Sequence, residues 1–161
     1  VLKWARTRDI DPMWVWAIMR TESNFNPTVK SWAGAHGLMQ IMPTTGRRLA
    51  RRFGIKDFKV KQLTDPLLNI ELGARYLRIL TDKFRHPLVA SAAYNAGPQR
   101  VRRWLPRTTM SADLWVETIP WKETRDYVKR IAYYQIIYAH RLGEPSQRLT
   151  QVFAKIRGGQ M

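Results

Sequence analysis

Pairs of a polar residue followed by proline mark the points where this chain is expected to begin helices. Asp11-Pro12, Asp65-Pro66 and His86-Pro87 each place proline at a first helical position, where its missing amide hydrogen costs nothing and its fixed φ suits the helix. In the first two pairs the aspartate is also a favoured N-cap residue. No stretch alternates apolar and polar residues as strands do, so we predict an all-α fold. The expected helices cover residues 12–23, 66–84, 87–97, 99–105 and 123–142.

Other segments are less regular. The glycine-punctuated stretch from Gly34 to Gly46 is expected to hold at most a short helix, followed by a helix over residues 47–53. Asp113 is expected to cap a turn that stops at Pro120. Residues 144–161 are weakly patterned and are expected to pack loosely. We therefore predict one domain over residues 1–161, with its core over about 10–142.

Composition narrows the class of protein. The chain has 161 residues, of which 45% are hydrophobic and 25% are charged. These values are typical of a globular domain and exclude a disordered tail, a collagen-like chain and a small disulfide scaffold. No apolar run approaches the roughly 20 residues that a membrane span needs. The chain has no cysteine, which excludes disulfides, and it begins at Val1 without a signal sequence, so we take it as a fragment or a processed form.

Charge and motif content constrain the partners. Lys and Arg number 28 against 12 Asp and Glu, which gives a net charge of +16. A charge this large indicates polyanionic surroundings, such as nucleic acid, anionic lipid or an acidic cell-surface polymer. His36, His86 and His140 are isolated, and no metal-binding spacing, P-loop or dinucleotide fingerprint is present, so we expect neither a metal nor a cofactor.

Glu22 is an acidic residue at a helix position where a charged side chain is not expected. It follows Val15, Ile18 and Met19 at helical spacing, which puts its carboxyl on the apolar face of the helix and close to the helix C-terminus. Burial and the helix dipole both raise the pKa of a carboxyl in that position above its usual value of about 4.3. A carboxyl that stays protonated near neutral pH suits a general acid. A buried glutamate paired with the backbone or an arginine is the alternative.

Four motifs occur in order along the chain. The pair Glu22-Ser23 is followed by a Gly-Leu-Met-Gln segment at 37–40 and by Ala-Tyr-Asn-Ala-Gly at 93–97, and a fourth region covers 116–120 and 123–128. Together they resemble the catalytic domain of the soluble lytic transglycosylases, a goose-lysozyme-like family that acts on peptidoglycan, over about residues 10–142. The resemblance implies an all-α, lysozyme-like helical domain with a substrate groove.

The resemblance also implies site residues. Glu22 takes the position of the single catalytic acid and base. The positions that bind substrate fall on Ser31, Gly37, Gln40, Met42, Thr45, Tyr94, Asn95, Glu117 and Tyr127. Two features depart from the family pattern: His36 stands where small polar residues are common, which puts it at the groove edge, and the run at residues 47–52 is unusually basic.

The implied reaction cleaves the β-1,4 bond between N-acetylmuramic acid and N-acetylglucosamine. Glu22 would protonate the leaving oxygen, the N-acetyl carbonyl would attack C1, and the C6 hydroxyl would then close onto C1 to give a 1,6-anhydromuramoyl end. Because the substrate supplies both nucleophiles, one carboxyl suffices where most glycosidases need two. The partners implied are glycan strands with stem peptides, with other cell-wall enzymes as further partners, in the periplasm or cell envelope and without nucleic acid.

Without the motifs, several of these residues have a purely structural interpretation. Ser31 and Gly37 would be turn residues, Gln40 a solvated surface side chain and Met42 a core residue. Glu117 would form a salt bridge to an arginine. Tyr94 would be a buried tyrosine, and Asn95 an asparagine that ends its helix. Six of the tryptophans are expected to lie mostly in the core: Trp14, Trp16, Trp32, Trp104, Trp115 and Trp121.

Two rival functions remain open on the sequence. A goose-type lysozyme would use the same fold and Glu22 with water as the nucleophile. A basic helical nucleic-acid-binding module would explain the arginine clusters at 47–52 and 100–107 and a Gly97-Pro98 turn that grips phosphate. The second rival leaves the carboxyl of Glu22 on an apolar face unexplained.

Overall fold

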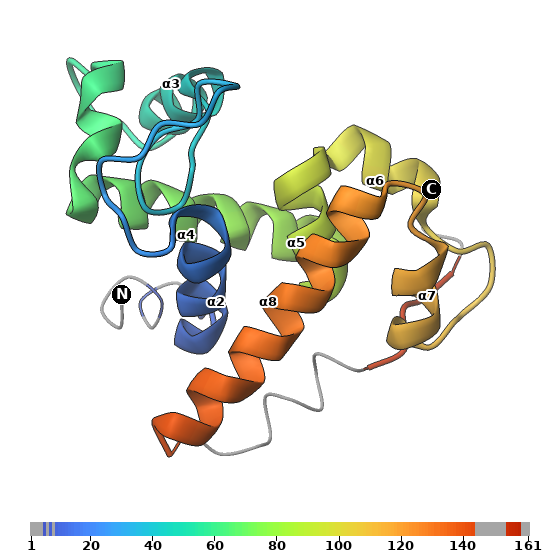
Figure 1. Ribbon diagram of the computed structural model, residues 1–161. Helices are drawn as coiled ribbons and strands as arrows, with labels where there is room; N and C mark the ends of the chain where they lie inside the picture. Colours follow the sequence, from blue (N-terminus) through green and yellow to red (C-terminus); the bar gives the residue numbers. More distant parts are fainter. Residues whose placement is uncertain (1–4, 6, 8, 144–153, 159–161) are drawn as a thin grey trace. The chain divides into compact units, whose positions relative to one another are not determined.

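The computed structural model describes residues 5, 7, 9–143 and 154–158, and its regular structure is helical (Figure 1). The α-helices are α2 (Pro12–Ser23), α3 (Pro43–Arg52), α4 (Pro66–Phe84), α5 (Pro87–Ala96), α6 (Pro98–Trp104), α7 (Ala112–Thr118) and α8 (Lys122–Arg141), with a 3-10 helix η1 at Val60–Thr64. Among the described residues, extended pairing is limited to isolated bridges. The predicted all-α fold is therefore confirmed.

The chain forms two compact units, Val1–Arg78 and Ile79–Met161, and the boundary between them falls within the sequence of α4. In the first unit α3 packs on η1, and in the second α5 packs on both α6 and α8 while α7 packs on α8 (Figure 1). Fully buried side chains of the first unit include Val15, Ile18, Met39, Leu49, Leu63, Leu72 and Leu77. Those of the second include Leu80, Val89, Trp115, Ile119 and Ile131.

The two aspartates before proline cap their helices as predicted, and His86, for which only a helix start was predicted, caps its helix as well. A carboxylate oxygen of Asp11 accepts a hydrogen bond of 2.9 Å from the amide two residues later, and Asp65 accepts one of 2.7 Å from the amide three residues later. His86 does the same through its Nδ1 atom, at 3.2 Å. Each cap satisfies an amide that the first helical turn leaves without a partner.

Helix α3 differs from the prediction because it begins at Pro43 and contains Gly46. A Cβ atom at Gly46 would lie 3.2 Å from side-chain atoms of both Leu63 and Phe58. The glycine therefore marks a close helix–helix approach, and not the turn that its type suggests. Asp113 also differs: Ser111 is the N-cap of α7, and Asp113 lies in the first turn, where a hydrogen bond from the Ser111 hydroxyl lowers the pKa of its carboxyl.

The C-terminal segment was predicted to pack loosely over residues 144–161. Residues 144–153 and 159–161 lie outside the described part of the chain. Within 154–158 the prediction is wrong, because Ile156 is buried and exchanges two backbone hydrogen bonds with Met110, of 3.0 and 2.8 Å.

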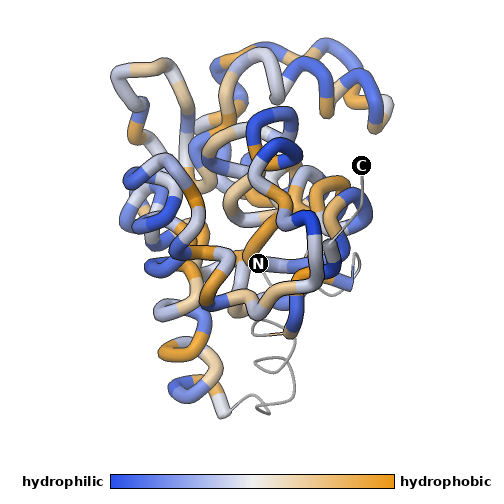
Figure 2. Tube along the Cα trace, turned by 90° about the vertical axis from the view of Figure 1, so that its right-hand side faces the viewer, coloured by the Kyte–Doolittle hydropathy of each residue, from blue (hydrophilic) through white to orange (hydrophobic). Residues whose placement is uncertain are grey.

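Hydropathy changes sign repeatedly along the chain. Hydrophilic and hydrophobic residues follow one another at short intervals along the tube of Figure 2, as amphipathic helices require. In the part of the chain that the structure describes, no helix has the length and apolar character needed to cross a membrane.

Candidate active site

Glu22 lies in the last turn of α2, which ends at Ser23. The residues one and two turns before it on the same face, Val15, Ile18 and Met19, are all buried, and Glu22 itself is half-buried. Asn24 ends the helix in the left-handed conformation, with a φ of 52°. The predicted position of Glu22 on the apolar face is therefore confirmed.

Ser23 fixes the end of α2 to the Gly-Leu-Met-Gln segment. Its hydroxyl donates to the carbonyl of Leu38 at 2.8 Å, and it also lies 3.1 Å from the carbonyl of Met19 one turn back. Both Ser23 and Leu38 are buried. The second residue of the Glu-Ser motif thus joins the helix that carries Glu22 to the second motif.

The loop that contains this segment is closed by its own hydrogen bonds. His36 and Ile41 exchange two backbone bonds of 3.1 and 3.0 Å, and the Gly37 amide donates to the carbonyl of Val29 at 3.0 Å. The side-chain nitrogen of Gln40 donates to the carbonyls of Gly37 at 2.8 Å and Val29 at 3.2 Å. Because both of its donors hold the loop, Gln40 can meet a ligand only through its carbonyl oxygen.

Gly37 is required by its backbone and by its neighbours. Its φ is +75°. A Cβ atom at Gly37 would lie 2.3 Å from the backbone carbonyl oxygen of Leu63 and 2.6 Å from the side-chain nitrogen of Asn69. The space that a side chain would take at Gly37 is thus filled by the protein itself. This supports the turn interpretation of Gly37.

Asn69 is a site residue that the sequence analysis missed. It is fully buried in α4, and its side chain accepts from the Met39 amide at 2.7 Å and donates to the carbonyls of His36 at 2.9 Å and Leu63 at 2.7 Å. One amide group therefore holds the loop, α4 and η1 together. The signal was present, because Asn69 precedes the buried Leu72 at helical spacing, as Glu22 follows Met19.

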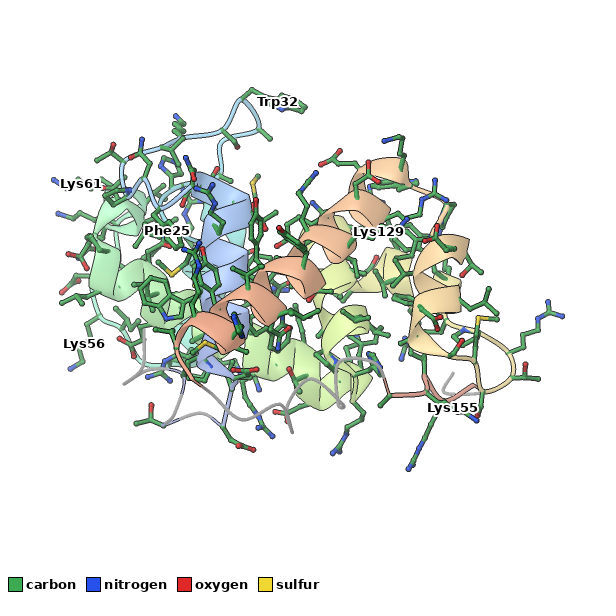
Figure 3. The ribbon with its side chains drawn as sticks, turned by 60° about the horizontal axis from the view of Figure 1, so that its bottom comes forward. Phe25, Trp32, Lys56, Lys61, Lys129 and Lys155 are labelled. Atoms are coloured by element: carbon green, nitrogen blue, oxygen red, sulfur yellow. The ribbon has the colours of Figure 1, made fainter. Side chains whose placement is uncertain are left out.

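Ser31 stabilises a turn that presents Trp32. The Ser31 hydroxyl accepts from the Ala35 amide at 2.9 Å, and the Gly34 amide donates to the Ser31 carbonyl at 2.9 Å. Trp32 stands at the tip of this loop, fully exposed, with its ring pointing away from the ribbon (Figure 3). Of the two interpretations of Ser31, the structure supports the turn.

Two predicted residues lie at the start of α3. Met42 is the N-cap residue and is 40% exposed, so the alternative that placed it in the core is wrong. Thr45 follows in the first turn and is half-buried. His36 is half-buried as well, and it is held by the backbone bonds of the loop.

In the second unit, Asn95 is held by α8. Its side-chain oxygen accepts a hydrogen bond of 2.7 Å from the hydroxyl of Thr124, which is fully buried. Tyr94, the residue before it, is half-buried in α5, and Tyr127 lies one turn after Thr124 and is 3% exposed. The packing of α5 on α8 thus joins the third motif to the fourth.

Glu117 forms a surface ion pair. Its carboxylate lies 2.7 Å from the ammonium nitrogen of Lys129, and the two side chains are 57% and 48% exposed. Lys129 is labelled on α8 in Figure 3. The expected salt bridge is present, but its partner is a lysine; the nearby Arg125 donates instead to the backbone carbonyl of Glu117 at 3.1 Å.

Two family profiles match the chain. That of the "Transglycosylase SLT domain" covers residues 1–114, and that of the "Soluble lytic transglycosylase helical domain" covers residues 118–147. The chain belongs to the transglycosylase SLT family. The resemblance inferred from the four motifs is therefore confirmed.

Individual SLT relatives agree with this. The soluble lytic murein transglycosylase of Salmonella typhimurium is 44% identical over 146 residues, which is 88% of this chain and 23% of that protein. An X-ray structure of an inactive glutamate-to-glutamine mutant of lytic transglycosylase Slt from Pseudomonas aeruginosa has a TM-score of 0.87 at 41% identity, covering 95% of this chain and 25% of that one. The 70 kDa soluble lytic transglycosylase of Escherichia coli has a TM-score of 0.85 at 39% identity, over 94% and 25%. The chain spans about a quarter of the length of these relatives.

The tryptophans of this SLT chain are less buried than predicted. Trp14 and Trp115 lie in the core, Trp16 and Trp104 are half-buried, and Trp32 and Trp121 are exposed. The expectation that most are core residues is therefore wrong. The Trp121 ring lies 5.7 Å from that of Trp104 and 4.5 Å from the guanidinium of Arg100, which covers part of this exposed aromatic surface.

Among the described residues, the acidic side chains do not gather into a metal site. Across the residues with described positions, no three His, Asp or Glu side chains come together in a way that could hold a metal ion. Within the described part of the first unit, Glu22 is the acidic residue that the sequence motifs, the apolar helix face and the Ser23 contact all single out.

Proposed function

We propose that this chain is a peptidoglycan lytic transglycosylase with Glu22 as its catalytic acid and base. One observation carries the proposal. In a chain of the SLT family, Glu22 lies in the last turn of α2, and the last residue of that helix, Ser23, bonds the loop of the Gly-Leu-Met-Gln motif. The relatives that match over most of this chain are named soluble lytic murein transglycosylases.

In the proposed reaction Glu22 acts twice. Its protonated carboxyl gives a proton to the oxygen that leaves N-acetylmuramic acid as the β-1,4 bond breaks. The N-acetyl carbonyl oxygen of the same sugar attacks C1 and forms an oxazolinium ion. The Glu22 carboxylate then takes the proton of the C6 hydroxyl, whose oxygen closes onto C1 and releases the N-acetyl group. The products are a 1,6-anhydromuramoyl end and a free 4-hydroxyl on N-acetylglucosamine.

A single carboxyl is sufficient for this route because the substrate supplies both nucleophiles. Inverting and retaining glycosidases need a second carboxylate at a set separation. The C6 hydroxyl is tethered to the sugar that it attacks, so its effective concentration is high. The inactive glutamate-to-glutamine mutant named for the Pseudomonas aeruginosa relative supports a reaction that depends on one glutamate.

We further propose that the predicted binding residues divide into two groups. Four of them contact the glycan directly, and the others, which are buried or bonded to other protein groups, position the backbone around it. The first group is Met42, Thr45, Tyr94 and the carbonyl oxygen of Gln40; the second is Ser31, Gly37, Asn95, Glu117 and Tyr127. The contacts of Ser31, Asn95 and Glu117 with other protein groups support this division.

The charge of the chain supports an anionic substrate. A net charge of +16 concentrates the protein near polymers that carry carboxylates, and peptidoglycan stem peptides carry them. We propose the periplasm or cell envelope as its place of action, with glycan strands and their stem peptides as substrate and with other cell-wall enzymes as further partners.

The test is mass spectrometry of the products released from purified peptidoglycan. The expected muropeptides end in 1,6-anhydromuramic acid and are lighter by one water than hydrolysed ones. The Glu22→Gln variant should release none while its circular dichroism stays that of the parent. Glu123→Gln, a change of the same kind at an exposed position in the first turn of α8, is the control and should stay active. Reducing ends in the products would show that water attacks, and would make the chain a lysozyme.

A further inference from the structure

An open pocket lies beside α3 in the first unit, and its lining begins at Arg47, two positions after the predicted binding residue Thr45. Its volume is about 450 Å³, which is in the range of sites that hold small ligands. The residues that line it are Arg47, Ala50, Arg51, Ile55, Asp57 and Phe58. None of them belongs to the predicted catalytic or binding set.

Two exposed arginines stand on one wall of the pocket. Arg47 and Arg51 are one helical turn apart on α3, and both are exposed. Within the described part of the chain neither guanidinium has an ion pair or a ring contact, whereas Arg75 nearby pairs with Glu71 at 2.7 Å and covers Phe53 at 4.1 Å. The pocket arginines therefore offer planar donor groups that match carboxylates.

The rest of the pocket is apolar except for one acid. Ala50 is buried, and Ile55 and Phe58 are half-buried, so they form an apolar surface beside the guanidinium groups. Asp57 is exposed and has a φ of 53°, a conformation that aspartate tolerates better than most residues. Its carboxylate adds a site for a cation next to two sites for anions.

Lysines surround this part of the molecule. Lys56, Lys59 and Lys61 are exposed in the segment that follows α3, and the side chains of Lys56 and Lys61 extend outward on the same side of the unit (Figure 3). Their charge raises the local concentration of anions and speeds their arrival. They do not line the pocket, so they add attraction without adding selectivity.

We propose that this pocket binds a short peptide that carries carboxylates and an amino group. The carboxylates pair with Arg47 and Arg51, the amino group with Asp57, and an alkyl side chain lies on Ile55 and Phe58. A phosphate polymer fits less well, because Asp57 repels it and the apolar surface has nothing to contact. The identification of the peptide as the stem peptide of peptidoglycan rests on the proposed function.

The experiment is a calorimetric titration of the whole chain with N-acetylated Ala-Glu-Lys-Ala, which has two carboxylates and one amine. Arg47→Gln/Arg51→Gln should weaken the affinity at least about tenfold, since hydrogen bonds between charged groups are lost. The control Arg102→Gln/Arg103→Gln removes the same charge from exposed positions of α6 and should change the affinity for the peptide less than about twofold. Asp57→Asn should weaken binding of this peptide but not of the one with acetylated lysine.

Three results of the titration would overturn the proposal: no binding to the parent chain, an equal loss in both arginine variants, or equal competition by inorganic phosphate at the peptide's concentration. The titration needs no turnover, so it stays readable if the chain proves inactive on peptidoglycan. Conversely, the Arg47→Gln/Arg51→Gln variant should still cleave glycan strands from which the peptides have been removed. Loss of that cleavage would place the pocket in the reaction itself and would also contradict the proposal.

Discussion

The hydroxyl of Ser23 donates a hydrogen bond of 2.8 Å to the carbonyl oxygen of Leu38. These residues are 15 positions apart, and each belongs to a different motif. Since Ser23 follows Glu22 directly, the bond fixes the end of α2 relative to the loop that includes Gln40. Displacement of this loop would move the neighbours of Glu22, so Ser23 is a positioning residue.

Ser23→Ala should lower both stability and turnover. The Leu38 carbonyl is buried and would lose the partner that Ser23 gives it, which costs about 1–3 kcal/mol of unfolding free energy. The expected fall is in kcat more than in KM, because Glu22 keeps its chemistry but loses its placement. Thr21→Ala is the matched control, since the Thr21 hydroxyl bonds within α2, to the carbonyl of Ala17 at 2.9 Å. Equal kcat values in the two variants would remove Ser23 from the site.

Gly37→Ala should be far more destabilising than Gly34→Ala. Both glycines have positive φ, of +75° and +86°, so alanine at either position costs about 1 kcal/mol in backbone strain. At Gly34 a Cβ atom meets nothing within 4 Å, whereas at Gly37 it would lie 2.3 Å from the Leu63 carbonyl oxygen. We expect Gly37→Ala to cost at least about 3 kcal/mol in denaturant unfolding. Similar losses in both variants would mean that the loop moves away from Leu63 at little cost.

Thr124→Val tests the support of Asn95. Valine has the shape of threonine but cannot donate to the side-chain oxygen of Asn95, so about 1 kcal/mol of unfolding free energy should be lost. If Asn95 is part of the site, activity on peptidoglycan should fall by about tenfold or more because its amide is no longer oriented. The control is Thr118→Val on the surface of α7, where the hydroxyl bonds the Trp115 carbonyl at 2.7 Å. Full activity of the Thr124 variant would contradict a role for Asn95.

Local chemistry explains what the sequence could predict. A cap such as Asp11 or Asp65 accepts a hydrogen bond from an amide two or three residues away. The start of the helix is therefore determined by residues within one turn of it. The position of Glu22 on the face of Ile18 and Met19 follows equally from helical spacing. Both features were predicted because nothing distant in the chain is needed to produce them.

Long-range contacts explain the features of the fold and the site that could not be predicted from the sequence. Gly46 has the residue type of a helix breaker, but it lies inside α3 because η1 packs closely against it. Asn69 holds the loop through hydrogen bonds to backbone atoms of residues 30 and 33 positions away in the sequence. The burial of tryptophans is decided in the same way. Trp115 and Trp32 are the same residue type, but the fold packs other residues around Trp115 and none of the described residues over Trp32. Trp115 is therefore fully buried and Trp32 fully exposed.

His86 should make the stability of the chain depend on pH. Its imidazole is buried, accepts from the Leu88 amide through Nδ1, and lies 2.9 Å from the Ala154 carbonyl through Nε2, so the ring is neutral with its proton on Nε2. Burial lowers the pKa of His86 below its usual 6.5, against the opposing effect of the Ala154 carbonyl. As the pH falls below 6.5, the unfolded chain therefore takes up a proton that the folded chain does not, and stability is lost down to the lowered pKa.

The measurement is denaturant unfolding of the parent and of His86→Asn between pH 7.5 and pH 5. Asparagine can still cap α5 but does not titrate. The free energy of unfolding of the parent, less that of the variant, should be constant above about pH 7 and should decrease below 6.5, by at most about 1.4 kcal/mol per pH unit. All other titrating groups are shared and cancel in the difference. A difference that stays flat would mean that His86 accepts its proton in the folded chain as readily as in the unfolded one, and a difference that increases toward acid pH would mean that it does so more readily; either would contradict the prediction.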